Sequence, residues 1–198
     1  MTVALPLGPL ARQAEVRFID FGSLTDPVLG GAVQRIDRLG SRFGLKLTYP
    51  RMNHEDASVL ISRILRGSSE GAEYPFPQGS FVPGNAGVLK IRTFTPAQTF
   101  SLPLKNSITG YSFKEGQFLH VKSSGRNYIH NITAAAVVGG AGTANIDLSV
   151  YPAIRTDFAV DDDVSITPIL QGFPSGDRNW TIDEARKYGI SLILDESE

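Results

Sequence analysis

Residues 42–76 read RFGLKLTYPRMNHEDASVLISRILRGSSEGAEYPF. Alternating apolar residues over 43–49 predict a strand with one apolar face, and Pro50 ends that strand. Apolar residues then recur at steps of three and four, which is typical of an amphipathic helix. The apolar stripe consists of Ala57, Leu60, Ile61, Ile64 and Leu65. We therefore expect a β-sheet with one helix packed against it.

The ends of this helix carry the usual signals. Asn53 is a good N-cap, and Glu55 and Asp56 follow in the first turn, where the helix dipole favours acidic groups. Arg63 and Arg66 fall in the expected last turn, and Gly67 stands where a left-handed cap is wanted. The sequence predicts a helix over 54–66, which is too short to be stable without packing its stripe on a sheet.

The preceding residues predict two further strands. Residues 14–21 and 32–38 read as strands, and the loop 22–31 between them contains the turn pairs Asp26-Pro27 and Gly30-Gly31. We expect strand 32–38 to form a hairpin with strand 43–49 through a turn at 39–42. After the helix, 68–87 reads as a loop in which Phe76 and Phe81 serve as aromatic anchors.

The middle of the chain has the spacing of turn residues that is typical of a small barrel. Between 88 and 167 the sequence predicts only short strands, with turn signals every eight to twelve residues. Two hairpins are expected, one turning at Ser124-Gly125 and one in which 137–142 joins strands on either side. We therefore predict that 86–167 forms an inserted β-barrel domain.

The end of the chain returns to the first sheet. Pro168 is followed by a Gly- and Pro-rich stretch (GFPSGDRN) that reads as a linker, and alternating apolar residues from Ile190 predict a final strand. Residues 181–188 fit either a strand or a short helix capped by Thr181 and Glu184, and we favour the strand. The predicted fold is mainly β: a β-sandwich or barrel sheet domain (1–85 with 168–198) with one packed helix, plus the inserted barrel.

Composition limits the classes of function. The 198 residues include 19 Lys plus Arg and 20 Asp plus Glu, for a net charge of -1, which argues against a dedicated nucleic-acid binder. There is no cysteine, so disulfides and thiolate metal sites are excluded. No apolar run is long enough for membrane insertion, and the start MTVALPLGPLARQ does not read as a signal peptide.

The residues predict no catalytic, cofactor or metal site. With a turn at Ser124-Gly125, His120 pairs with Ile129 and His130 with Leu119, so the two histidines diverge to opposite faces. His54 belongs to the helix. The acidic run 161–163 lacks calcium-loop spacing, and there is no G-x-S-x-G elbow.

The order of features resembles that of distal tail (Dit-like) proteins, which are structural proteins of the tail tip of tailed bacteriophages. The resemblance covers most of 14–196 and rests on motifs in sequence. They are VRFIDF, a loop with D-P and G-G, RFGLKLTYP, EDASVLISRILRG, YPFP, GYSFKEGQFLHVKSSGRNYIHNITA, GTANIDLSVYPAIR and ISLILDE.

The resemblance implies a subunit that forms a ring, usually a homo-hexamer, between the tail tube protein and the tail-tip hub protein of the baseplate. It implies a virion protein, present in the host cytoplasm during assembly, with no enzymatic activity and no cofactor. Larger members carry a long C-terminal carbohydrate-binding-like domain that this sequence lacks, so we expect a purely structural role. We expect subunit contacts from the loops 22–31 and 68–87, at Asp26, Pro27, Leu29, Tyr74, Phe76 and Phe81.

Two alternatives from other classes stay open. The middle barrel is a candidate carbohydrate- or ligand-binding module, such as a receptor-binding accessory, for which Tyr111, Phe113 and Tyr128 are the available aromatics. A hydrolase with an unrecognised carboxylate pair is the other. A different phage connector or tail-hub protein could share the same motifs.

Overall fold

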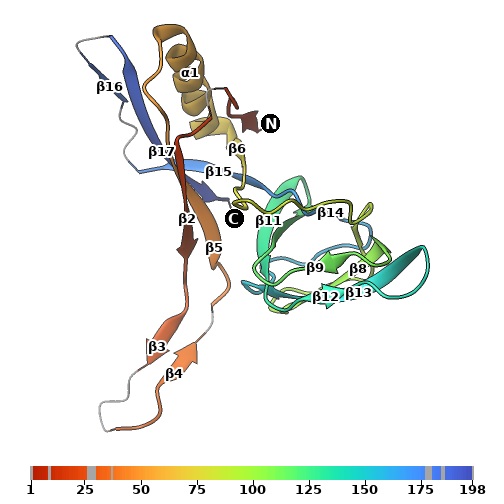
Figure 1. Ribbon diagram of the computed structural model, residues 1–198. Coiled ribbons are helices and arrows are strands. Elements are labelled where there is room, and N and C mark those ends of the chain that lie inside the picture. The colour runs from red at the N-terminus through yellow and green to blue at the C-terminus, as the bar shows by residue number, and fades with distance from the viewer. Residues whose placement is uncertain are drawn as a thin grey trace.

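The chain folds into an open β-sheet that carries one helix, with a closed β-barrel beside it (Figure 1). The computed structural model describes residues 2–8, 10–25, 30–36, 38–176, 180–183 and 186–197. The predicted fold class, mainly β with one packed helix and a small β-barrel, is confirmed.

The open sheet is built from both ends of the chain. Its strand order is β1 (Val3–Ala4), β6 (Ala72–Pro75), β15 (Ile169–Ser175), β17 (Tyr188–Glu196), β5 (Arg42–Thr48) and β2 (Gln13–Ile19), and β16 (Trp180–Ile182) also pairs with β17. β17 is antiparallel to β15 and to β5, so the last strand of the chain lies inside the sheet. Residues 180–182 form a strand, as favoured, whereas Glu184 lies outside the described residues.

One part of the predicted linker is a central strand. The stretch beginning at Gly172 belongs to β15, where Gly172 pairs with Glu196. A Cβ at Gly172 would lie 1.8 Å from the Asp195 carbonyl oxygen, so the backbones approach too closely for any side chain. Gly172 therefore serves the close approach of two strands rather than flexibility. The composition suggested a linker because Gly and Pro are also the residues typical of turns and loops.

The helix α1 (His54–Glu70) lies against one face of the sheet and is longer than predicted. Gly67 lies inside the helix instead of capping it, and the helix ends at Gly71, whose φ is +85°. A Cβ at Gly67 would come within 2.9 Å of the Ala72 Cβ, so the glycine allows β6 to approach the helix closely. Leu60 and Ile64 are buried as expected, but Leu65 is 53% exposed and does not face the sheet. The Asn53 side chain makes no capping hydrogen bond.

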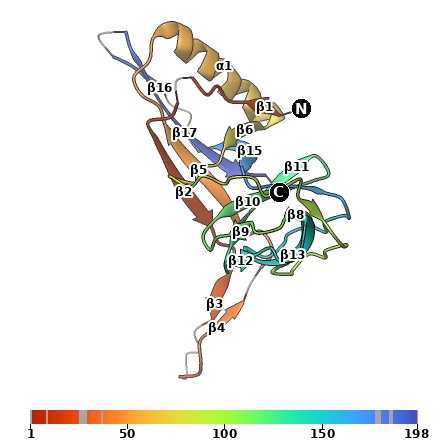
Figure 2. The ribbon, with the colours of Figure 1, turned by 45° about the vertical axis from the view of Figure 1, so that its right-hand side comes forward.

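The predicted hairpin of 32–38 with 43–49 is wrong. β4 (Gln34–Ile36) pairs with β3 (Ser23–Thr25), while β5 pairs with β2. The two pairs are successive parts of one antiparallel ribbon, so residues 39–41 interrupt one leg of the ribbon and do not form a turn between paired strands. Figure 2 shows the β3–β4 part extending away from the rest of the molecule.

The barrel closes in the strand order β10 (Phe118–Ser123), β11 (Arg126–Ile132), β13 (Thr143–Tyr151), β8 (Ser101–Ile108), β7 (Lys90–Ile91) and β14 (Asp163–Ser165). The predicted register of the Ser124-Gly125 hairpin is confirmed, with His120 opposite Ile129 and Leu119 opposite His130. The second predicted hairpin is wrong, because β12 (Ala136–Val137) pairs with β9 (Ser112–Phe113) and β13 pairs mainly with β8.

Two hydrophobic cores meet at the junction of sheet and barrel. One core lies between α1 and the sheet, and the other fills the barrel. Ile129 of barrel strand β11 belongs to the sheet core, and the Phe118 ring lies 4.8 Å from that of Phe76 and 5.3 Å from that of Phe43. The barrel is therefore packed onto the sheet through aromatic side chains.

Candidate assembly surfaces

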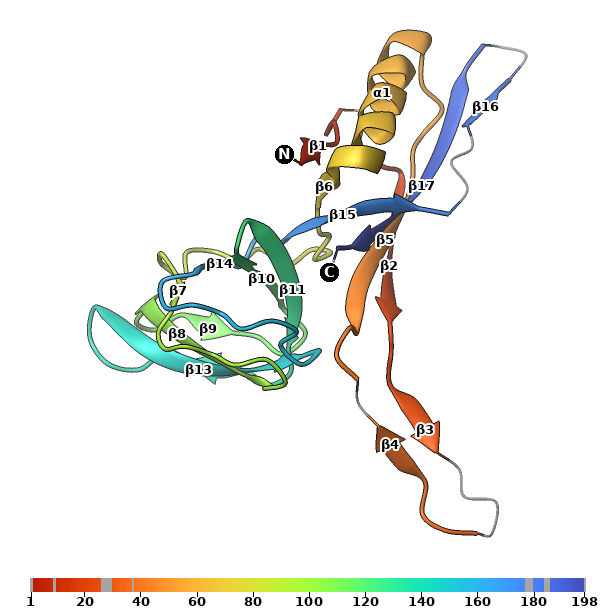
Figure 3. The same ribbon diagram turned by 180° about the vertical axis from the view of Figure 1, so that it is seen from behind.

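A ribbon of two strands projects from the rest of the molecule, and we call its described residues, 20–25, 30–36 and 38–41, the arm (Figure 3). Ser23 lies opposite Ile36 and Leu24 opposite Arg35, so Leu24 and Ile36 lie on opposite faces of the ribbon. Leu24 is 69% exposed and Ile36 is 48% exposed. Both faces of the arm therefore present apolar side chains to solvent.

Polar contacts hold the arm at its base. The Asp20 carboxylate accepts hydrogen bonds from Gly22 N at 2.8 Å, Ser41 Oγ at 3.1 Å and Arg35 Nη2 at 3.0 Å. The Gly22 N–H contributes most to lowering the pKa of Asp20, and Ser41 and Arg35 add to it. Arg35 also donates to the Tyr151 hydroxyl of the barrel at 3.2 Å, so the arm leaves the body in a defined direction.

Strand β2 continues the exposed surface from the arm into the sheet. It is the last strand in the order of the sheet, and its outer edge has no neighbouring strand among the described residues. Val16 and Phe18 share one face of β2 and are both exposed. Phe18 is partly covered by the rings of Phe43 and Tyr151, at centroid distances of 5.3 and 5.5 Å. An unpaired edge with apolar neighbours is suited to pairing with another chain.

A second apolar surface lies at the end of the molecule away from the arm (Figure 1). Here α1 and β16 flank a groove of about 480 Å³. Apolar side chains of Ile61, Leu65, Trp180, Ile182 and Tyr188 contribute to its lining. Leu65 fell on the predicted inward stripe of the helix, yet it faces this groove rather than the core.

The residues predicted as subunit contacts fall in different environments. Asp26, Pro27 and Leu29 lie outside the described residues. Tyr74 and Phe76 are buried in the core between helix and sheet, so their rings serve the chain's own packing. Phe81 is partly exposed, with Lys114 Nζ 5.6 Å from its ring centroid. Sequence reasoning missed Phe18, Leu24 and Ile36, although the arm overlaps the predicted contact loop.

Within the part of the chain that the structure describes, the histidines and the acidic side chains do not form a metal-binding cluster. Among the described residues, no group of three or more His, Asp or Glu side chains could hold a metal ion. Burial, assisted by the positive charges of Lys122 and Arg155 respectively, lowers the pKa of His120 and of His130 to about 4. Both histidines are therefore neutral packing groups at neutral pH.

The aromatics that a sugar-binding barrel would need are turned inward. Phe113 and Tyr128 are buried in the barrel core, where the Tyr128 ring lies 5.7 Å from that of Phe158. Tyr111 is partly buried and donates a hydrogen bond to the Pro83 carbonyl oxygen at 2.6 Å. These rings offer little flat surface on which a sugar could stack.

The chain matches no protein-family model and no curated protein sequence with which it was compared. Within the part of the chain that the structure describes, no helix has the length and apolar character required to cross a membrane.

Proposed function

We propose that this protein is a structural subunit of a bacteriophage tail tip, which assembles into a ring between the tail tube protein and the tail-tip hub protein. The observation that carries the proposal is the arm, a projecting ribbon with exposed apolar side chains on both faces. The arrangement suits assembly through complementary surfaces rather than catalysis.

The arm is poorly suited to exist alone in water. A two-stranded ribbon without further strands or a packed helix is marginally stable. Leu24 and Ile36 are large apolar groups that remain 69% and 48% exposed in the described chain. A second molecule that covered either face would remove this apolar surface from water, at a gain of about 25 cal/mol per Å².

The positions of the surfaces favour a ring over a two-fold dimer. The arm and the α1–β16 groove lie at opposite ends of the molecule (Figure 1), so contacts between unlike surfaces can repeat from copy to copy. Head-to-tail contacts of this kind close into a ring when the rotation between subunits permits. The resemblance to distal tail proteins supports six copies and a place in the virion.

Light scattering and electron imaging of the purified chain, alone and mixed with a tail tube protein from the same source, test the proposal. We expect a ring of defined order in at least one sample, and we expect the double variant L24S/I36S to remain monomeric. V137S is the matched control, since Val137 is 68% exposed but lies on β12, outside the arm and outside both predicted contact loops. A parent chain that stays monomeric at high concentration in both samples would contradict the proposed function.

A further inference from the structure

Barrel strand β11 has an open edge that faces the sheet. β11 pairs with β10 from Arg126 to Asn131, but it pairs with β13 only at Asn131 and Ile132. The N–H groups of Asn127 and Ile129 point away from β10, because alternate residues of an antiparallel strand bond to opposite sides. β11 therefore has no pairing with β13 over residues 126–130, and this edge of the strand is open.

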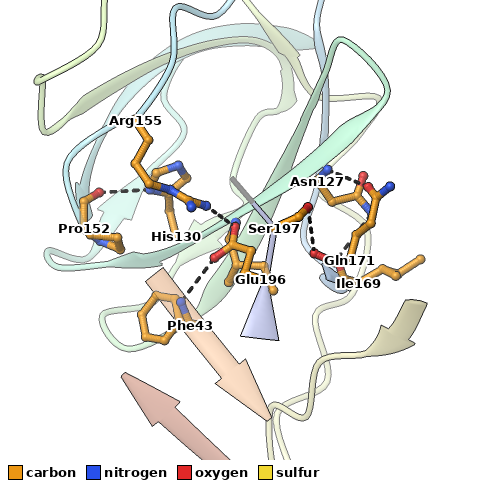
Figure 4. A network of polar contacts seen from close by, with 10 residues as sticks. Phe43, Asn127, His130, Pro152, Arg155, Ile169, Gln171, Glu196 and Ser197 are labelled. Carbon is orange, nitrogen blue, oxygen red and sulfur yellow. Dashed lines mark hydrogen bonds and ion pairs between the residues drawn. The ribbon is translucent and has the colours of Figure 1, made fainter. Parts of the chain in front are cut away.

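Two side chains of the sheet close this edge (Figure 4). Gln171 Oε1 accepts a hydrogen bond from Asn127 N at 2.9 Å, and Glu196 Oε1 accepts one from Ile129 N at 2.8 Å. Gln171 lies on β15 and Glu196 on β17, which are adjacent strands. Their oxygens occupy the role that the carbonyl groups of a neighbouring strand would take. We call Gln171 and Glu196 the clasp.

Glu196 joins three separate parts of the molecule. Its other oxygen, Oε2, accepts from Phe43 N of β5 at 3.2 Å. Oε1 also forms an ion pair with Arg155 Nη2, from the segment that follows β13. Both side chains are nearly fully buried. Both carboxylate oxygens of Glu196 are bonded, whereas Arg155 Nε and Nη1 are buried without a hydrogen-bond partner among the described residues. One carboxylate therefore ties β5, β11 and the Arg155 segment together.

The Arg155 segment is itself fixed to the barrel. The Arg155 guanidinium lies over the Tyr128 ring, with Cζ 5.2 Å from the centroid. His130 Nδ1 lies 3.0 Å from the Pro152 carbonyl oxygen, which anchors the same segment to β11. Gln171 adds a further link by donating from Nε2 to the Gly125 carbonyl oxygen at 3.4 Å.

We propose that the clasp is a conformational latch, which sets the orientation of the barrel on the sheet by taking the place of a missing strand beside β11. Opening the clasp leaves the ring contacts of Phe118 and the hydrogen bonds to Ile169 as the links that hold the barrel, and it widens the range over which the barrel can turn on the connecting segments 76–89 and 166–168. This inference does not depend on ring formation. In a ring, the latch would fix the position of each barrel relative to the sheet of its own subunit.

Two cysteines introduced for spin labels measure the barrel orientation directly, because the chain has no cysteine of its own. Exposed Val59 on α1 and Val137 on β12 are suitable sites. We expect V59C/V137C to give one narrow distance distribution, and we expect E196Q or Q171A in that background to broaden it. Glu196→Gln preserves the side-chain volume but places an amide NH₂ group against one of the N–H donors that bond the carboxylate. D195N, on the opposite face of β17, is the control.

Amide hydrogen exchange provides a second readout. In the parent, the Asn127 and Ile129 amides should be protected, and Q171A should accelerate exchange at Asn127 by about tenfold, the effect of losing one hydrogen bond. A narrow distance distribution in both variants would overturn the proposal. If E196Q does not fold, the distance distribution of Q171A and the exchange rates of the parent test the proposal. Rapid exchange at both the Asn127 and the Ile129 amide of the parent would also overturn the proposal.

Discussion

The barrel and the arm differ in how they cover their apolar side chains. The barrel strands close on one another and surround a core in which Leu104, Phe113 and Phe158 are fully buried. The arm has only two strands, and its apolar residues lie open on both faces. A closed barrel surrounds its own core and leaves open only the edge of β11 that Gln171 and Glu196 bond, whereas a two-stranded ribbon cannot enclose a core. The contrast shows that the barrel core is covered within one chain, whereas the apolar side chains of the arm are not, and on the proposed function a second molecule would cover them.

Replacing a core leucine of the barrel should produce the largest loss of stability. Leu104→Ala removes a fully buried side chain and leaves a cavity, so we expect the free energy of unfolding to fall by about 4 kcal/mol. Urea unfolding followed by circular dichroism measures this. A loss below about 1 kcal/mol would show that the barrel core relaxes around the cavity.

A methyl group at the centre of the sheet should cost slightly less. Gly172→Ala places a Cβ within 1.8 Å of the Asp195 carbonyl oxygen, and the two strands must separate to accept it. We expect a loss of about 3 kcal/mol in the same measurement. Gly139→Ala is the control, since a Cβ there meets no atom within 4 Å and should change stability little. Equal effects of the two substitutions would refute the role given to Gly172.

The buried barrel histidines should make the protein sensitive to acid. Folding lowers the pKa of His120 and of His130 from 6.5 to about 4, so their stabilising effect is complete above pH 6.5 and is lost as the pH falls toward 4. We expect each histidine to account for about 2 kcal/mol of the stability lost between pH 7.5 and 5.

Unfolding of H120Q and H130Q at both pH values tests this expectation against H54Q, a control at an exposed histidine. Burial raises the pKa of Glu196, which acts in the opposite direction, so the informative quantity is the difference between each variant and the parent. The same pH dependence in H120Q, H130Q and the parent would rule out the histidines as its source.

The smallest effect on stability is expected in the arm. Leu24→Ala makes the same chemical change as Leu104→Ala, but at a side chain that is already in water, so the free energy of unfolding should change by less than about 0.5 kcal/mol. Self-association, measured by light scattering, should weaken. A stability loss close to that of Leu104→Ala would mean that the arm packs within its own chain.

Local signals in the sequence predicted the elements that depend on neighbouring residues. The helix was found from its stripe and its acidic first turn, and the hairpin at Ser124-Gly125 was predicted with the observed register. The fully inward position of His130 and the diverging direction of His120 follow from that register. The predicted fold class was correct because alternation and turn residues report directly on strands.

The errors have a common cause in contacts between distant residues. Gly67 and Gly172 read as a helix cap and a linker, but each is a site where another backbone or side chain comes too close for a Cβ. Leu65 fits the helical stripe, yet it lines the groove between α1 and β16 and is not part of the core. The predicted strand 32–38 contains β4, which pairs with β3 before it and not with β5 after it, a choice that local alternation does not encode.

The sequence by itself determined a mainly β chain, one amphipathic helix, a barrel-like middle and the lack of a catalytic motif. Only the tertiary structure decided that the arm projects from the rest of the molecule and that Gln171 and Glu196 close the barrel edge. The reason is physical: periodicity and turn chemistry act over a few residues, whereas the clasp joins Phe43, Ile129 and Arg155 to Glu196 across long stretches of chain.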